Sequence, residues 1–234
     1  MSALDRSSIF LALRLAAVVA AAVYAGRQVR KPTRFVGRLF ARMMNNSHCA
    51  LTDWAFSRVD MSNEAIALDV GCGGGRTIEK LAQRIAKVHG IDYSAGSVAA
   101  SRVHNKSLIA RGRVVVQQAS VSHLPFADNC FDLVTAVETQ YYWPDVVSDM
   151  REILRVLKPG GPLMVVAESY KGASNDWLLG PIMQLLGSHR LSVDDHRALF
   201  QQAGYIAVEI FEERRRGWLC AAGRKPPQGA GAPP

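Results

Sequence analysis

The stretch "AIALDVGCGGGRTIEKLA", residues 65–82, passes from an apolar run through four glycines into a segment with helical spacing. The apolar run 65–70 predicts a buried strand, and 76–86 predicts a helix. Glycine lets a ligand approach the backbone closely, and the start of a helix presents N–H groups and a positive dipole end. The junction therefore predicts a ligand site at the carboxyl end of a strand.

Strands and helices alternate along the rest of the chain. Expected strands lie at 87–92, 113–120, 131–139, 162–169, 205–213 and 217–225, and expected helices at 94–112, 144–161 and 192–204. One or two further helices are expected within 35–59, and a short apolar helix, interrupted by Gly180 and Pro181, near 177–186. This alternation predicts an α/β fold with a mainly parallel sheet and helices on both faces.

Composition and charge narrow the class of protein. The chain has 234 residues, of which 49% are hydrophobic, enough for one domain with a sizeable core. Four widely spaced cysteines form no CxxC pair, so neither a metal site nor a disulfide framework is expected. Residues 1–42 hold eight basic side chains and one acidic one, whereas the remaining 192 residues hold 20 basic and 19 acidic ones. A nearly neutral body disfavours binding to nucleic-acid phosphates.

The N-terminal segment is apolar and then basic. Residues 8–26 carry one charge, Arg14, and are followed by "RQVRKPTR". About 20 such residues can just cross a hydrocarbon core of roughly 30 Å, so a single membrane anchor is the favoured interpretation, with the basic cluster on the cytoplasmic side. A signal peptide, or a helix that docks on the domain or on a second copy of it, remains open.

The glycine spacing separates two ligand classes. Dinucleotide-binding turns follow GxGxxG and need a small residue at the sixth position, but the sixth position counted from Gly71 is Arg76. Gly71, Gly73 and Gly75 instead spell GxGxG. Asp92, at the end of the next expected strand, can accept hydrogen bonds from ribose hydroxyls, a role found in either class. The pattern predicts a nucleoside-containing ligand and disfavours an NAD(P)-dependent oxidoreductase.

Four blocks, "ALDVGCGGG", "VHGIDYS", "LPFADNCFDLVTAVET" and "ILRVLKPGG", resemble the successive motifs of class I S-adenosylmethionine-dependent methyltransferases. The similarity covers about residues 43–223. Within that superfamily the sequence resembles the branch with the ubiquinone and menaquinone C-methyltransferases and many bacterial small-molecule methyltransferases. The resemblance implies a Rossmann-like, seven-stranded, mostly parallel sheet with an antiparallel last strand. It also implies one S-adenosyl-L-methionine site at the carboxyl ends of the first strands.

The resemblance also implies roles for individual residues. The turn Gly71–Gly75, with Asp69 before it, would surround the methionine part of the cofactor. Asp92 would take the ribose hydroxyls. Ser120 departs from the acidic residue that such families often carry, so contact with the adenine would weaken or pass to Val121 and His123. The implied cofactor-binding residues are Asp69, Gly71, Cys72, Gly73, Gly75, Asp92, Tyr93, Ser120, Val121 and Glu138.

Methyl transfer requires a general base only when the acceptor must lose a proton. The catalytic candidates are His48, Glu138 and Tyr142, with Tyr141 beside them. Each has another interpretation: His48 as a helix-start residue, the tyrosines as packing residues, and Glu138 as a cofactor or loop ligand. Alignment of the two reactants can supply much of the rate acceleration without any base.

The expected organisation is an N-terminal helix (1–34), a methyltransferase domain (35–225) and a disordered tail (226–234). The apolar segment 177–186 resembles a lid over the acceptor pocket, which favours a small, apolar acceptor and no nucleic acid. Use of a cytosolic metabolite argues against export, so the expected location is the cytoplasm or the cytoplasmic side of a membrane. A nucleic-acid methyltransferase and a non-catalytic cofactor-binding scaffold are the alternatives.

Overall fold

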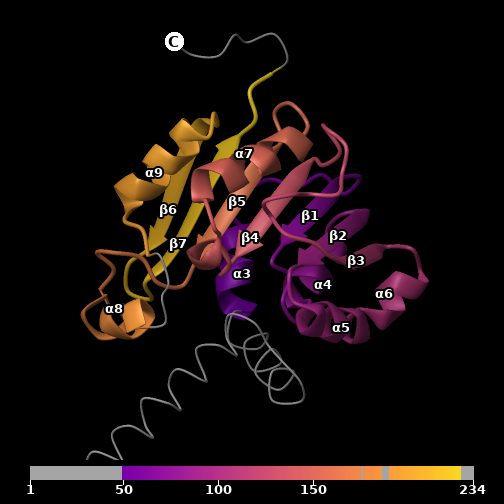
Figure 1. Cartoon of the computed structure of the whole chain (residues 1–234), viewed down its shortest axis with the longest axis horizontal. Coiled ribbons are helices and arrows are strands. Elements are labelled where there is room, and N and C mark those ends of the chain that lie inside the picture. Colours follow the sequence, from indigo (N-terminus) through magenta and orange to yellow (C-terminus); the bar gives the residue numbers. More distant parts are fainter. Residues whose placement is uncertain (1–48, 175, 186–189, 228–234) are drawn as a thin grey trace, which may run out of the picture.

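A seven-stranded sheet runs through the described part of the chain, which in this computed structural model comprises residues 49–174, 176–185 and 190–227 (Figure 1). The strand order is β3-β2-β1-β4-β5-β7-β6. The strands are β1 (Ile66–Val70), β2 (Lys87–Asp92), β3 (Val114–Gln118), β4 (Leu133–Val137), β5 (Pro162–Ala167), β6 (Ile206–Glu213) and β7 (Trp218–Arg224).

The direction of the strands confirms the predicted sheet. The pairs β1–β2, β1–β4, β2–β3 and β4–β5 are parallel, and β7 is antiparallel to both β5 and β6. The chain order reverses between β1 and β4, because β2 and β3 extend the sheet on one side and β4 and β5 on the other. In open α/β sheets a ligand binds beyond the carboxyl ends of the strands at such a reversal.

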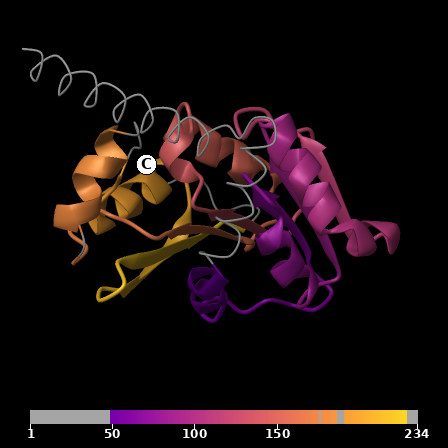
Figure 2. The ribbon, with the colours of Figure 1, turned by 90° about the horizontal axis from the view of Figure 1, so that it is seen from below.

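Helices cover both faces of the sheet (Figure 2), and a separate hydrophobic core lies between the sheet and the helices on each face. Apolar side chains of α3 (Cys49–Phe56), α4 (Arg76–Ala82) and α5 (Ala95–His104) are buried in one core. Those of α7 (Val146–Val156) and α9 (Val193–Gln202) are buried in the other. The remaining described helical segments are α6 (Lys106–Ala110), η1 (Gln140–Tyr142) and α8 (Asp176–Leu185).

Several expected helices differ from those in the structure, and the one expected at 76–86 ends at Ala82. The helix expected at 94–112 divides into α5 and α6 at Asn105. The side chain of Asn105 donates to the backbone carbonyls of Gly75 and Ser101. The helix expected to reach Gly161 ends at Val156, because Leu157 is extended and bridges to Phe131. The expected interruption near residue 180 is wrong: α8 runs continuously with Pro181 inside it.

Several predictions fall outside the described residues. These are the apolar helix over 8–26, the wider segment 1–34, the candidate base His48 and most of the tail 226–234. Among the helices that the structure does describe, none combines the length and the apolar character needed to cross a membrane.

Candidate active site

The glycine turn between β1 and α4 adopts backbone conformations that favour glycine. Gly71, Gly73 and Gly75 have φ angles of 73°, 49° and 88°. The amides of Gly71 and Cys72 both donate to the carbonyl oxygen of Ile91 at 2.9 Å. These bonds fix the turn to the end of β2 and leave it above the point where the strand order reverses.

The three positive-φ glycines have different surroundings. A Cβ atom on Gly71 would collide with the side chain of Thr139, and one on Gly75 with the side chains of Asn105 and Ser101. A Cβ on Gly73 would meet no heavy atom within 4 Å. Gly71 and Gly75 are therefore required by packing within the protein, whereas Gly73 leaves open space in which a ligand can approach the backbone.

Asp92, at the end of β2, lies against this turn. Its Oδ2 accepts from the amide of Gly73 at 3.0 Å, and its Oδ1 accepts from the amide of Ser94 at 2.8 Å. Asp92 as a whole is 7% exposed. Burial raises the pKa of Asp92, and the two amide hydrogen bonds act in the opposite direction. The structure thus brings together the glycine turn and the Asp92 carboxylate, which the sequence analysis assigned to one ligand site.

Asp69 adds a second buried carboxyl group beneath the turn. Its Oδ1 accepts from the hydroxyl of Thr135 at 2.8 Å, while Oδ2 has no hydrogen-bond partner among the described residues. Burial raises the pKa of Asp69 to about 7, although the Thr135 hydrogen bond opposes the shift. A cationic group next to Oδ2 would both satisfy this atom and favour its ionised form.

The other predicted cofactor-binding residues occupy two kinds of position. The side chains of Cys72 and Val121 are buried in the two cores, so their contribution to a ligand falls to the backbone. Tyr93, at the end of β2, is 45% exposed. Ser120, beyond β3, is exposed, and its Oγ accepts from the amide of Ser122 at 3.2 Å. Tyr93 and Ser120 thus lie beyond the ends of β2 and β3, where the adenine of the cofactor is expected.

The catalytic candidates Glu138, Tyr141 and Tyr142 lie together where β4 ends. Glu138 has a φ of 57°, which is uncommon for a residue other than glycine. Its Oε1 accepts from the hydroxyl of Tyr141 at 3.1 Å and from the amide of Glu168. Burial raises the pKa of Tyr141 well above its usual range, so this hydroxyl keeps its proton. The Glu138 carboxylate is thus held between the ends of β4 and β5.

Three residues that sequence reasoning missed support the site. Asn105 Nδ2 donates to the carbonyl of Gly75 at 2.9 Å, and Thr135 donates to Asp69. Thr139 packs against Gly71. Thr135 and Thr139 both lie within the block that resembles the fourth-strand motif, so these two carried a signal. Asn105 lies 30 residues from Gly75 in the chain, and nothing in the local sequence indicates that contact.

Buried side-chain nitrogen and oxygen atoms without hydrogen-bond partners are concentrated near the carboxyl ends of the parallel strands. Such atoms are few in native proteins and each requires an explanation. Within the described ranges they belong to Asp69, Arg76, Ser101, Asn105, Gln140, Ser169 and His196. The first four lie in or against the glycine turn, and Gln140 and Ser169 follow β4 and β5, which is the arrangement of a site completed by a polar ligand.

Comparison with known proteins agrees with this geometry. Residues 68–165 match the model of the methyltransferase domain family. The chain is 32% identical to "Methyltransferase GfsG" of Streptomyces halstedii over 165 residues, 68% of this chain and 59% of that protein. It is 35% identical over 111 residues to a "Ubiquinone biosynthesis O-methyltransferase" of Pseudomonas fluorescens, 47% of this chain and 46% of that protein. The chain thus spans about half the length of these curated relatives.

A solved structure with a similar fold contains the expected cofactor. It is the Haemonchus contortus phosphoethanolamine N-methyltransferase 2 in complex with S-adenosyl-L-methionine, with a TM-score of 0.67. The two chains are 17% identical, and the match covers 76% of this chain and 53% of that one. At 17% identity this similarity supports the fold and nothing beyond it. Residues 68–165 carry a methyltransferase domain, and the sheet topology, the turn with its carboxylate and the sequence similarity resemble those of the class I S-adenosylmethionine-dependent methyltransferases, whose cofactor is S-adenosylmethionine.

Proposed function

We propose that the protein transfers a methyl group from S-adenosylmethionine to a small, largely apolar acceptor. The observation that carries the proposal is the hydrogen bond between the Gly73 amide and Asp92 Oδ2. It joins an open glycine backbone and a buried carboxylate into one site, and those two features suit the amino-acid and ribose parts of this cofactor.

The described residues fit the cofactor. The turn Gly71–Gly75 would hold its amino-acid portion, Asp92 its ribose hydroxyls, and Tyr93 would lie against the adenine. The unpartnered Oδ2 of Asp69 suits a positive charge, which the cofactor carries at two positions. When bound, S-adenosylmethionine supplies an electrophilic methyl group attached to a sulfonium.

The contribution of the chain is mainly binding and alignment. Holding two reactants in line can supply up to ~7–11 kcal/mol of the activation barrier. The Glu138 carboxylate, fixed by Tyr141 and the Glu168 amide, faces the same strand ends and can hold a proton or a polar group of the acceptor. Tyr142, half-buried with its ring centroid 6.1 Å from that of Tyr141, would line the same region.

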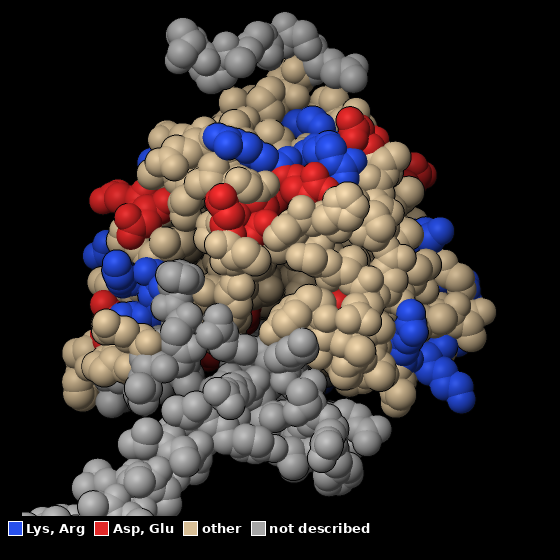
Figure 3. All heavy atoms as spheres, viewed as in Figure 1, with Lys and Arg blue, Asp and Glu red and all other residues tan. Residues whose placement is uncertain are grey.

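Two observations favour a small acceptor over nucleic acid. On the face shown in Figure 3, Lys and Arg side chains form separate clusters, those in the upper part beside Asp and Glu side chains, and no continuous basic strip runs across it. One of the curated relatives described above is named as an O-methyltransferase of ubiquinone biosynthesis, which acts on a small molecule. The apolar sequence of α8, with Trp177 79% exposed, supports an apolar acceptor.

A screen with radiolabelled cofactor tests this function. Purified full-length protein is incubated with labelled S-adenosylmethionine and panels of phenols, quinols, thiols, amines and fatty acids, and in separate reactions with RNA and DNA, and transfer to the recovered product is counted. The expected result is label in at least one small apolar acceptor and none with the Asp92→Ala variant. Label in RNA or DNA would favour the nucleic-acid alternative, and cofactor binding without any transfer would favour a non-catalytic scaffold.

Membrane association through residues 8–26 is part of the proposal. The apolar run and the basic cluster after it support an anchor with the domain on the cytoplasmic side. A variant lacking residues 1–30 should lose partition into membranes while its affinity for S-adenosylhomocysteine stays close to that of the full chain. Unchanged partition would remove the anchor from the proposal.

A further inference from the structure

The helix α8 presents an uncharged face to solvent. Trp177, Pro181 and Gln184 are all exposed, and Trp177 is 79% exposed. These residues are four and three positions apart, so they lie on one face of the helix. Tryptophan is enriched at protein interfaces and at the boundary between membrane and water, where its ring is apolar and its N–H group is polar. This face of α8 is therefore a candidate contact surface.

A basic turn lies beside the start of α8. Arg214, Arg215 and Arg216 follow one another between β6 and β7, and all three are exposed. The hydroxyl of Ser174, two residues before α8, donates to the backbone carbonyl of Arg214. In Figure 1 the tip of the β6–β7 hairpin lies between α8 and α3. The three arginines are thus neighbours of the exposed face of α8.

A fourth arginine joins this group from the end of α3. Arg58 is exposed, and its Cζ lies 5.3 Å from the ring centroid of Trp54. The Cζ of Arg216 lies 4.6 Å from the ring centroid of Trp218. The two tryptophan rings are 5.9 Å apart, centroid to centroid. Contacts of arginine with aromatic rings hold the two guanidinium groups on the same side of the hairpin.

The acidic side chains near the hairpin are less exposed than these arginines. Glu212 accepts a hydrogen bond from the hydroxyl of Tyr170 at 2.6 Å, and Glu213 is half-buried. Lys171 interacts with Asp195, so it adds no net charge to the group. The charges that project furthest from the hairpin are therefore positive, which suits an anionic partner.

The hairpin tip lies at the same edge of the sheet as the cofactor site. Ala167, the last residue of β5, pairs with Leu219 near the start of β7, so the turn before β7 lies at the carboxyl ends of the parallel strands. The start of α3 lies at this edge as well. Glu79, and to a lesser extent Cys49, raises the pKa of Arg76, the first residue after the glycine turn.

The part of the chain before α3 leads to this edge. Forty-eight residues precede Cys49, and they include the apolar run 8–26 and the basic cluster that follows it. A segment that enters a bilayer would bring the edge that carries Cys49 close to the lipid headgroups. Tryptophan is favoured at headgroup level, and arginine is attracted to anionic lipids. These observations favour an anionic lipid bilayer over a second copy of the chain as the partner.

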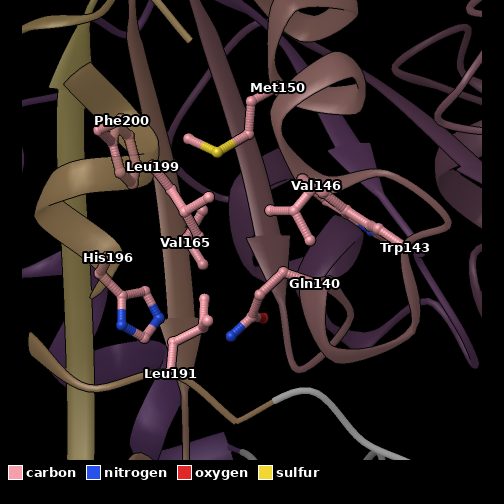
Figure 4. A pocket seen from close by; sticks show the side chains of 9 residues that line it. All are labelled: Gln140, Trp143, Val146, Met150, Val165, Leu191, His196, Leu199 and Phe200. Atoms are coloured by element: carbon pink, nitrogen blue, oxygen red, sulfur yellow. The ribbon is translucent and has the colours of Figure 1, made fainter. Parts of the chain in front are cut away.

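The pocket between α7, α9 and β5 offers no alternative place for an acceptor (Figure 4). Its space suits about one water molecule. Gln140 and His196, which line it, are each 2% exposed and carry atoms without hydrogen-bond partners among the described residues, as expected where a buried water binds. An acceptor is instead expected from the carboxyl edge, where Gly73 faces open space.

We propose that α8 and the arginines of the β6–β7 turn form a surface that rests on an anionic lipid bilayer, with Trp177 among the headgroups and the cofactor edge turned toward the lipid. The contact uses side chains of the domain itself, so it adds to residues 8–26 and does not depend on them. Its role in supplying an apolar acceptor from the bilayer rests on the proposed function. Salt should weaken the contact, because ~0.1 M salt screens charges beyond about 10 Å.

Quenching of Trp177 fluorescence tests this surface on the full-length chain. Of the four tryptophans, Trp143 and Trp218 are buried, Trp54 is half-buried and Trp177 is exposed, so the difference between wild type and Trp177→Phe isolates the Trp177 signal. The probes are vesicles of phosphatidylcholine brominated near the headgroup, with and without phosphatidylglycerol. Trp177 should be quenched strongly only when phosphatidylglycerol is present, and high salt should reverse the quenching.

Two charge variants locate the contact. Arg214→Gln combined with Arg215→Gln should reduce the lipid-contact equilibrium of Trp177 by roughly tenfold or more. Lys106→Gln combined with Arg111→Gln removes two exposed charges at α6, which packs on β3 at the other edge of the sheet, and should leave the quenching unchanged. Circular dichroism checks that each variant is folded, and the comparison of lipids and salt on the unaltered chain requires no variant.

Other outcomes would overturn the proposal. They are partition of the chain into vesicles without quenching of Trp177, equal quenching by neutral and anionic vesicles, and quenching that survives the arginine variant. Shielding of Trp177 from acrylamide in the absence of lipid, increasing with protein concentration, would assign this face to a second copy of the chain. If Trp177 is quenched as expected but no acceptor is methylated, the proposed function fails and the lipid-binding surface remains.

Discussion

The amide nitrogen of Gly73 donates a hydrogen bond to Oδ2 of Asp92 across 3.0 Å. The first residue belongs to the turn after β1 and the second ends β2, so the bond joins the carboxyl ends of two neighbouring parallel strands. Gly73 faces open space, and Asp92 keeps further lone pairs beyond its two amide bonds. The turn and the carboxylate therefore act as one unit, and a change in either should affect the other.

Removal of the carboxylate should weaken cofactor binding. Asp92→Ala is expected to reduce the affinity for S-adenosylhomocysteine by at least about tenfold, since a hydrogen bond to a charged group contributes ~1.5–3 kcal/mol. Calorimetric titration measures the effect. Glu64→Ala, which removes an exposed carboxylate in the turn before β1, is the control and should bind as the wild type does. Equal affinity in both variants would refute the assignment of Asp92.

The two neighbouring glycines should respond differently to an added methyl group. Gly71→Ala places Cβ against Thr139, so it should lower the unfolding free energy by more than the ~1–3 kcal/mol expected from a left-handed backbone alone. Gly73→Ala should cost only that backbone strain yet weaken cofactor binding, because its Cβ enters the open space. Denaturant unfolding and calorimetry separate the two effects. A fully stable Gly71→Ala protein would contradict the packing described.

Asn105 should influence the cofactor without touching it. Asn105→Ala removes the hydrogen bonds to the carbonyls of Gly75 and Ser101, which should cost ~1–3 kcal/mol of stability. The loosened turn should also reduce cofactor affinity severalfold. Asn63→Ala, at an exposed turn position, serves as the comparison. Loss of stability with unaltered affinity would show that Asn105 supports the fold alone.

The pH dependence of stability should reveal Asp69. Burial raises the pKa of Asp69 to about 7 in the folded protein, against 3.8 for an aspartate in the unfolded chain. As the pH rises, the unfolded state therefore loses this proton before the folded state does. The contribution of Asp69 to stability is therefore complete below about pH 4 and is lost by about pH 7, with a slope of up to ~1.4 kcal/mol per pH unit. Asp69→Asn should remove that fall while keeping an acceptor for Thr135.

The measurement is the unfolding free energy of cofactor-free protein between pH 4 and 8, expressed as the difference between variant and wild type. The difference is needed because carboxylates with a lowered pKa, such as Glu152, act in the opposite direction. Glu64→Gln is the matched control. A variant with the same pH profile as the wild type would show that folding does not raise the pKa of Asp69.

Local sequence predicted the parts of the site that depend on neighbours in the chain. The apolar run before Gly71, the glycines themselves and Asp92 at a strand end all carry their signal within a few residues, and β2 has the predicted bounds 87–92. The roles of Asn105 and Thr139 depend on which strands and helices become neighbours, and side-chain periodicity does not encode that information. Asn105 also divides α5 from α6, so the same long-range contact explains the wrong helix boundary.

The pocket lined by Gln140 and His196 was not predictable for the same reason. Gln140 follows β4 and His196 belongs to α9, 56 positions later in the chain. In sequence, His196 is one polar residue among the charged residues that begin a helix, and its unpartnered Nε2 becomes evident only when α9 packs beside α7. The short apolar helix before it was predicted, whereas its continuity through Pro181 was not.

The most direct test of the account is calorimetric titration of the purified full-length chain with S-adenosylmethionine and S-adenosylhomocysteine, with NADH as the comparison ligand. The account predicts saturable binding of both sulfur ligands at one site per chain, with competition between them and no heat from NADH. Absence of heat from both sulfur ligands, or displacement of either by NADH, would contradict it.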